Sequence, residues 1–151
     1  MAPKSKPLKS KTSKYFKCKQ CLGYVLNSRR RAHRCEKPSE ENVFANLEEE
    51  PREAWVKLRK FASKLGSQKI YCSAKAVMFS RNVCYMFVRS KKSRIELCFM
   101  LDRKLDHEQI KKVDAYSKTR FRHTVDVHHE DLIEEPLTDW ILEAWKIAAK
   151  S

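Results

Sequence analysis

The spacing of apolar residues predicts two helices in the part of the chain that follows residue 38, and a capping pattern predicts a third. Two stripes recur at three- and four-residue spacing, namely Trp55, Leu58, Ala62 and Leu65 in one and Leu137, Trp140, Ile141, Ala144, Trp145 and Ala148 in the other. The first stripe predicts a helix that has Pro51 at its first position and ends at Gly66. The second predicts a helix over residues 134–149. Ser39, followed by two glutamates, predicts the start of a further helix.

Between the two stripes the chain is rich in β-branched and aromatic residues, which predicts strands. We place five of them, near residues 69–74, 83–89, 94–102, 112–116 and 119–128. Alternation assigns two sets to the inward face, namely Ile95, Leu97, Phe99 and Leu101, and Phe121, His123, Val125 and Val127. It assigns the outward face of the last strand to Arg120, Arg122, Thr124 and Asp126. The order of elements predicts an α+β fold, in which an antiparallel sheet of about five strands carries helices on one face.

The N-terminal part differs in composition from the rest. Residues 1–14 contain mostly Lys, Ser and Pro, and such a segment buries too little apolar surface to fold, so we predict a disordered basic tail. Residues 15–37 hold three cysteines and a histidine at short spacing and predict a small zinc-finger domain. Residues 38–151 are then the α+β core domain.

Charge is distributed unevenly between these parts. The formal net charge is +14, and residues 1–35 account for +11 of it because they contain no acidic residue. Residues 36–151 hold the other 22 basic and all 19 acidic residues, so the core is nearly balanced. A basic segment joined to a balanced domain is typical of proteins that bind a polyanion, most often a nucleic acid.

The four candidate metal ligands are Cys18, Cys21, His33 and Cys35. A two-residue gap lets one turn present both Cys18 and Cys21 to a single ion, and the intervening residues allow the chain to return with His33 and Cys35. Three thiolates and one imidazole make a closed tetrahedral site, so we predict a structural Zn²⁺. The His-x-Cys pair is the unusual part of the pattern. Two alternatives are a thioredoxin-like redox pair, which needs a βαβ setting, and a disulfide framework, which needs an oxidising compartment.

The basic residues of this part predict contacts with phosphates. They are Lys4, Lys6, Lys9, Lys11, Lys14, Lys17, Lys19, Arg29, Arg30, Arg31 and Arg34. The arginines lie between the two ligand pairs, so bound zinc would hold them in a fixed position. About eight phosphate contacts give a salt slope near −7. The alternative is that the lysines only keep the protein dissolved or act as a nuclear import signal.

The sequence also bears on location. No apolar stretch approaches the roughly 20 residues of a membrane helix, and the N-terminus lacks the apolar segment of a secretory signal. We therefore expect no membrane partner and a reducing intracellular location, in the nucleus, the cytoplasm or a nucleic-acid-containing particle. In that setting Cys72, Cys84 and Cys98, which lie singly in apolar runs, are expected to be buried free thiols.

Catalysis is not favoured by the residues. His123 shares a face with apolar neighbours and is expected in the core, while His128 and His129 point in opposite directions. No Ser-His-Asp spacing or paired-acid motif is present, and two glycines, Gly23 and Gly66, do not make a phosphate-binding loop.

Several segments resemble a bacterial family known as domain of unknown function 5655, in members with an N-terminal finger. The similar segments are Phe16 to Cys35, Lys75 to Phe79, Leu101 to His107, Arg120 to His123, Leu137 to Trp140 and Glu143 to Trp145. The resemblance covers about residues 15–149 and implies a zinc module followed by an α+β core, with Lys75 leading a strand. It implies little about activity. The lysine tail and the arginine triplet depart from the family's pattern.

Three functions follow, of different classes. The first is a nucleic-acid-binding protein, with DNA favoured over RNA, in which tail and finger contact phosphates without sequence preference. The second is an adaptor with a protein partner, to which Trp55, Trp140 or Trp145 would contribute. The third is an enzyme with a basic pocket formed by Lys75, Arg103, Arg120 and His123, which rests only on family-matched positions.

Overall fold

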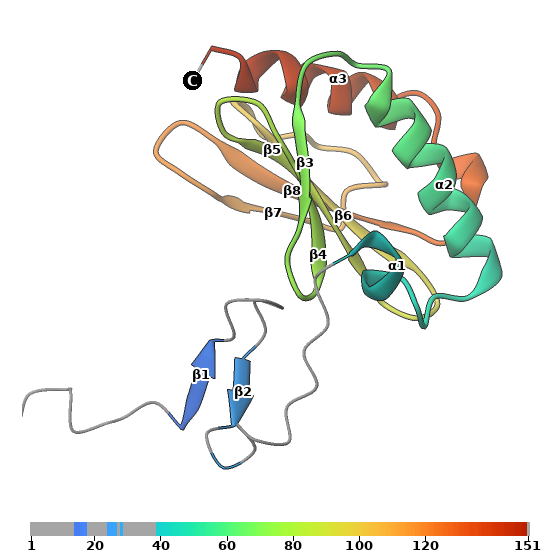
Figure 1. The fold of residues 1–151 in the computed structure, drawn as a ribbon. Coiled ribbons are helices and arrows are strands. Elements are labelled where there is room, and N and C mark those ends of the chain that lie inside the picture. Colours follow the sequence, from blue (N-terminus) through green and yellow to red (C-terminus); the bar gives the residue numbers. More distant parts are fainter. Residues whose placement is uncertain (1–13, 18–23, 27, 29–38, 151) are drawn as a thin grey trace, which may run out of the picture. The chain divides into compact units, whose positions relative to one another are not determined.

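The computed structural model describes residues 14–17, 24–26, 28 and 39–150. The chain divides into two compact units, residues 1–38 and residues 39–151. The first unit contains strands β1 (Tyr15–Lys17) and β2 (Tyr24–Leu26), which pair antiparallel with Phe16 opposite Val25. These strands flank residues 18–23 in the sequence, and that segment, which contains Cys18 and Cys21, lies outside the described residues (Figure 1).

The second unit begins with two helices. In α1 (Glu40–Val43) the Ser39 hydroxyl accepts a hydrogen bond from the Asn42 amide at 3.1 Å, which confirms the predicted helix start. Helix α2 (Glu49–Ser63) begins two residues before Pro51. The prediction that Pro51 occupies the first helical position is therefore wrong. Proline is tolerated there because the first-turn amides of a helix have no acceptor within the helix.

Six strands form one antiparallel sheet, and they are β3 (Lys69–Cys72), β4 (Ala76–Ser80), β5 (Cys84–Ser90), β6 (Ile95–Leu101), β7 (Lys112–Ala115) and β8 (Phe121–Val127). Their order is β3-β4-β5-β6-β8-β7. The chain after β6 first forms the edge strand β7 and then returns as β8 between β6 and β7. A short 3-10 helix, η3 (Glu130–Leu132), and the closing helix α3 (Leu137–Ala148) follow.

The sheet has one strand more than the spacing of residues predicts. Strand β4 reads as a continuous apolar run because Val77 and Phe79 are fully buried on one face while Ala76 and Met78 are largely covered on the other. A strand covered on both faces shows no alternation, so periodicity does not reveal it. The family resemblance does place a strand there. In β5 a bulge inserts Tyr85 beside Met86 on the helix side.

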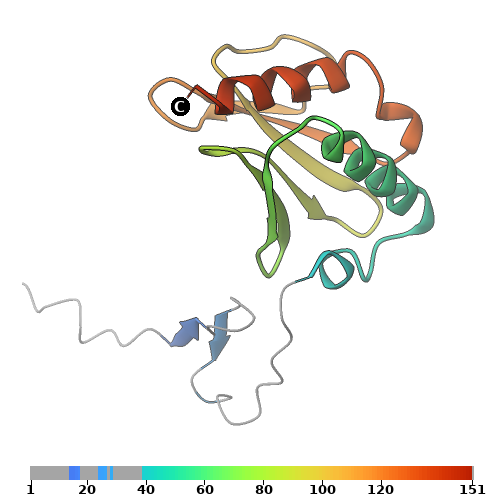
Figure 2. The same cartoon turned by 45° about the horizontal axis from the view of Figure 1, so that its top comes forward.

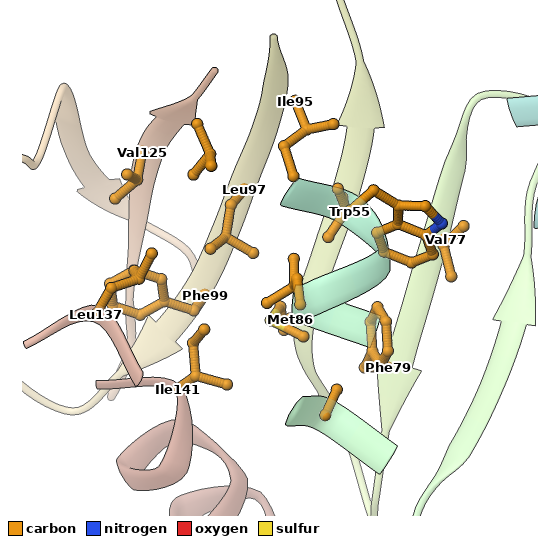
Figure 3. Close-up of a cluster of buried hydrophobic side chains, with 14 of the residues drawn as sticks. Trp55, Val77, Phe79, Met86, Ile95, Leu97, Phe99, Val125, Leu137 and Ile141 are labelled. Carbon is orange, nitrogen blue, oxygen red and sulfur yellow. The ribbon is translucent and has the colours of Figure 1, made fainter. Parts of the chain in front are cut away.

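Helices α2 and α3 cover one face of the sheet, as Figures 1 and 2 show. Most of the predicted stripe residues are buried there, and the two at the margin, Leu65 and Trp145, are partly buried. Figure 3 shows the side chains that meet between the layers, among them Trp55 from α2, Phe99 from β6 and Ile141 from α3. Each large apolar side chain buried in this way stabilises the fold by about 1.5–3 kcal/mol.

The predicted inward faces are confirmed for β6 and for His123, Val125 and Val127 of β8. Phe121 is only partly buried, and Arg120 and Thr124 are each 8% exposed although alternation assigns them outward. The set Ile95, Leu97, Phe99 and Leu101 lies in the core under the helices, together with Val125 and Val127. In the register of β6 and β8, Leu97 is opposite Val125 and Cys98 is opposite Thr124. Within residues 39–150 no helix covers the second face of the sheet, which we call the open face. No helix among the described residues has the length and apolar character needed to cross a membrane.

Candidate nucleic-acid interface

The predicted zinc site lies outside the described residues. This holds for Cys18, Cys21, His33 and Cys35 alike, and within the described part of the chain no cluster of three or more His, Cys, Asp or Glu side chains could hold a metal ion. Of the eleven basic residues assigned to phosphate contacts, Lys14 and Lys17 are described, and both are exposed. The other nine lie outside the described residues, so their role stays a prediction.

A row of facing side chains crosses the open face from edge to edge. The register places in it Tyr71, Met78, Phe87, Cys98, Thr124 and Lys112, one from each strand. Phe87 and Cys98 are 6% and 3% exposed, and the neighbouring Met100 on the same face is 1% exposed. The centre of the open face is therefore apolar.

Cys98 is a thiol at the centre of this face. Its Sγ lies 3.6 Å from the Thr124 hydroxyl, and burial raises its pKa. Burial likewise raises the pKa of Cys84 and Cys72, which are half-buried. Cysteines whose pKa is raised stay protonated and are poor nucleophiles at neutral pH. All three thiols are free, but the expectation of burial is met only by Cys98, because Cys72 and Cys84 are half-buried.

Two depressions hollow the open face around this apolar centre. The larger has a volume of about 1280 Å³ and the smaller about 180 Å³, and Phe87, Arg89 and Arg122 line both. We call the two depressions together the basic groove, because seven bases and a single acid, Glu96, are the charged residues of the described chain that line it. The bases are Lys75, Arg89, Lys91, Lys92, Lys111, Lys112 and Arg122.

The acids of the open face are neutralised by ion pairs. Glu96 lies 3.7 Å from Arg89, and Asp126 contacts both Arg94 at 3.2 Å and Lys111 at 3.1 Å. The third acid, Asp114, is paired with Arg122, whose hydrogen bonds lower the pKa of that carboxyl.

Other bases of the groove carry uncompensated charge. Within the described part of the chain, Lys75, Lys91 and Lys92 have no acidic oxygen within 4.0 Å, and all three are exposed. The groove therefore presents excess positive charge to an incoming ligand.

The near balance of charge in the core conceals a separation between its parts. Residues 64–128, which form the sheet and its loops, hold fifteen Lys or Arg and six Asp or Glu residues. Residues 39–63 and 129–148, which contain the helices, hold five basic and twelve acidic residues. The sheet layer is thus positive and the helix layer negative, although their sum is small.

Two tyrosines lie at the edges of the open face. Tyr71 on β3 is 42% exposed, and Tyr116, directly after β7, is 47% exposed. Partial burial raises the pKa of Tyr116. Tyr71 on β3 and Arg122 on β8 line the same depression although three strands lie between theirs, which indicates that the sheet curls toward its open face.

The residues of the enzyme hypothesis do not share one cleft. Lys75 lines the basic groove on the open face, whereas His123 lies on the helix side, stacked on Phe99 at a ring distance of 5.2 Å. Arg103 is exposed and makes two hydrogen bonds, of 2.9 and 3.1 Å, with Glu143 on α3. Arg120 is 8% exposed, and its carbonyl oxygen accepts the Tyr116 amide at the β7–β8 turn.

His123 has a structural environment, as predicted for a core histidine. Its Nδ1 donates to the Phe121 carbonyl at 3.1 Å, and its Nε2 accepts the Leu105 amide at 3.0 Å. A carbonyl can only accept and an amide can only donate, so these bonds require the neutral ring. Burial lowers the pKa of His123, which favours the same form. The histidine ties the loop between β6 and β7 to the core.

Residues 40–148 match the family described as Domain of unknown function (DUF5655). This chain belongs to that family. The match covers most of the chain and begins at α1, so it includes the basic groove and leaves the cysteine segment outside. No curated protein and no solved structure matches the chain.

Sequence reasoning did not find the basic groove. Its bases come from four separate stretches between Lys75 and Arg122, and only the strand register brings them together. One signal was available in the sequence. Counting charge separately for predicted helices and strands would have shown that the strand-rich segment is strongly basic.

Proposed function

We propose that this protein binds nucleic acid, with DNA as the favoured ligand, through contacts that are largely independent of sequence. One observation carries the proposal: basic residues are concentrated where they can act together. Residues 1–35 contribute +11 with no acid, and the described core adds a groove lined by seven bases and one acid. Clustered Lys and Arg residues gain affinity for polyanions by releasing condensed counterions.

The proposal includes a structural Zn²⁺ bound by Cys18, Cys21, His33 and Cys35. The described strand pair supports it, since β1 and β2 have three residues each, pair with one another and lie in the sequence on either side of the Cys18–Cys21 segment. A two-stranded hairpin of this size is at best marginally stable in water, so it needs a further source of stability. Zinc supplies roughly 10–16 kcal/mol in finger peptides. The ion would hold Arg29, Arg30 and Arg31 in position.

The adaptor alternative loses its candidate contacts. Trp55 and Trp140 are 7% and 8% exposed and lie in the core between sheet and helices. Trp145 is partly buried, and the Arg81 guanidinium stacks on its ring at 3.8 Å. All three tryptophans therefore serve packing within residues 39–150.

Salt dependence of binding tests the proposed function. Binding of the full chain to a duplex oligonucleotide is measured by fluorescence anisotropy over a range of salt concentrations. The triple variant combines Arg29→Gln, Arg30→Gln and Arg31→Gln and so loses three phosphate contacts. At about 0.9 per contact, the slope of log Kobs against log salt should become shallower by about 2.7. A matched variant combines Lys57→Gln, Lys60→Gln and Lys64→Gln on the exposed side of α2 and just after it.

The matched variant loses the same formal charge, so it reports the effect of net charge alone. The proposed role of the arginines is contradicted if both triple variants bind with equal affinity and equal slope. The whole proposal is contradicted if the full chain binds neither duplex nor single strand at low salt.

A further inference from the structure

We infer that the basic groove on the open face is a binding site for single-stranded nucleic acid, separate from the predicted contacts of residues 1–35. The inference relies on the proposed function only for the class of ligand. It adds a second site in the core and specifies that the bases of the strand must be unpaired.

The charge of the groove identifies a polyanion as its occupant. Its lining holds seven Lys or Arg residues, of which Arg89, Lys111 and Arg122 are paired with Glu96, Asp126 and Asp114. Lys75, Lys91 and Lys92, which are unpaired among the described residues, supply the excess charge. Helices on the opposite side carry the acids of the core, so a polyanion approaching the protein is drawn to the sheet side and repelled from the helix side. A protein partner would need a strongly acidic surface to fit this face equally well.

The apolar centre of the groove distinguishes a single strand from a duplex. Met78, Phe87 and Cys98 form an apolar floor in which Phe87 and Cys98 are nearly buried, so the ring of the groove on which a nucleobase can stack is that of Tyr71, 42% exposed at one edge. In a duplex the base faces are stacked inside the helix, so only phosphates and groove edges can reach such a surface. Unpaired nucleobases offer flat apolar faces that stack on aromatic side chains, while the phosphates contact the Lys and Arg side chains at the rim.

The size of the open face suits a short stretch of single-stranded nucleic acid. Measured along the curved sheet, six neighbouring strands cover about 24 Å at roughly 4.8 Å per interval, and the curl brings the two edges closer together than that. Tyr71 and Tyr116 mark the two edges and remain about half exposed, so both rings are available for stacking. Lys75 and Lys91 lie exposed beside the larger depression, where phosphates between stacked bases would pass.

Cation-π contacts already organise the groove. The Arg89 guanidinium lies 5.0 Å from the centroid of the Phe87 ring, and the Lys69 amine lies 5.9 Å from that of Tyr71. In the first pair Phe87 is nearly buried and Arg89 is paired with Glu96, whereas the second pair presents a charge next to an exposed ring. This combination contacts a phosphate and its base at the same time.

The test compares a 12-nucleotide single strand with the duplex of the same sequence, using the full chain and anisotropy at fixed salt. Tyr71→Ala should weaken binding of the single strand about tenfold, within the range expected for loss of one base-stacking contact, and should leave duplex binding nearly unchanged. Tyr71→Phe keeps the ring and should bind like the wild type. Val56→Ala removes an equally exposed apolar side chain from α2 and should have no effect.

The electrostatic part is tested with Lys75→Gln and Lys91→Gln combined. Loss of two phosphate contacts should reduce the salt slope for the single strand by about 1.4, at roughly 0.7 per contact. The matched control combines Lys57→Gln and Lys60→Gln on α2, which remove the same charge from the helix side. Photocrosslinking of a strand that contains 5-iodouracil should label the segment 69–92 in the wild type, which locates the contact without any substitution.

The outcomes separate the inference from the proposed function. If single-strand binding is the same in the groove variants and their controls, and no crosslink falls in residues 69–92, the groove is not the site, although binding through residues 1–35 can stand. If duplex and single strand are affected equally, the site reads phosphates alone and the inference is wrong. If neither ligand binds, both proposals fail. Repeating the assay with RNA and DNA strands shows which sugar is preferred.

Discussion

At the scale of single residues, His123 is a neutral buried histidine that holds a loop. Both ring nitrogens make hydrogen bonds, Nδ1 with the Phe121 carbonyl and Nε2 with the Leu105 amide. The imidazole stacks on the Phe99 ring, which also stacks with Trp140. Of the charged groups near it, Arg103 lowers its pKa and Glu143 raises it, and these two also pair with each other. Burial remains the largest cause, so the pKa of His123 lies below its ordinary value of 6.5.

This environment predicts that the protein loses stability as the pH falls. In the unfolded chain the histidine binds a proton near pH 6.5, whereas in the folded state it does so only at lower pH. The free energy of unfolding should therefore be highest above about pH 7 and decrease toward pH 5, by up to about 1.4 kcal/mol per pH unit from this group.

The variant His123→Gln isolates that contribution. It should be less stable than the wild type at pH 7 by about 1–3 kcal/mol, because the Leu105 amide loses its well-placed acceptor, Nε2 of His123. Its unfolding free energy should depend less on pH over the same interval, because the contribution of His123 is removed while those of the other histidines remain. Urea denaturation at several pH values measures both effects. Parallel curves for the two proteins would show that His123 does not contribute to the pH dependence.

At the scale of elements, the connection from α2 to β3 is fixed by contact with α3. Gly66 has a φ of +131°, and a Cβ placed on it would lie 2.8 Å from Cζ2 of Trp145. The indole Nε1 donates to the Ser67 carbonyl at 3.3 Å, and Arg81 stacks on the ring. Glycine is thus required twice here, once for the backbone conformation and once for the close approach of the tryptophan.

Gly66→Ala should therefore destabilise the protein by about 1–3 kcal/mol, a cost of the size found for single strained backbone positions. Thermal or urea unfolding measures it. Ser67→Ala is the matched control, because the exposed side chain is removed while the carbonyl that accepts from Trp145 remains. Equal stability of Gly66→Ala and the wild type would mean that the backbone and the indole readjust freely, contrary to this account.

The elements that the sequence predicts well are those with one buried face. The stripe on α3 and the inward set on β6 follow from periodicity alone, because burial on one side imposes a repeat. Strand β4 escapes periodicity because its open-face residues, Ala76 and Met78, are apolar like the buried Val77 and Phe79 of its other face. The groove escapes it for another reason: Tyr71, Phe87 and Arg122 are distant in sequence and become neighbours only through the order β3-β4-β5-β6-β8-β7.

At the scale of the whole molecule, two regions of positive charge lie in separate units of the chain. One is the segment of residues 1–35 and the other is the basic groove of the core. If each binds nucleic acid, the second contact forms at the effective concentration set by the connection between them, so the combined affinity exceeds that of either one. The two contributions differ in their dependence on metal, because the predicted zinc ligands belong to residues 18–35.

Removal of zinc should therefore separate the two contributions. The purified protein should contain about one zinc per chain, and chelation or Cys18→Ser should abolish it, because a closed tetrahedral site needs all four ligands. Binding to a duplex should weaken as the arginines lose their fixed positions, whereas binding of a single strand to the groove should persist. The thermal transition of the core should stay in place, because its buried apolar cluster is built from residues 43–148.

Cys72→Ser is the control, since that half-buried thiol belongs to the core and should leave the zinc content unchanged. A metal-free protein that binds the duplex as tightly as the zinc-loaded one, with the same salt slope, would show that the arginines need no metal to reach the phosphates.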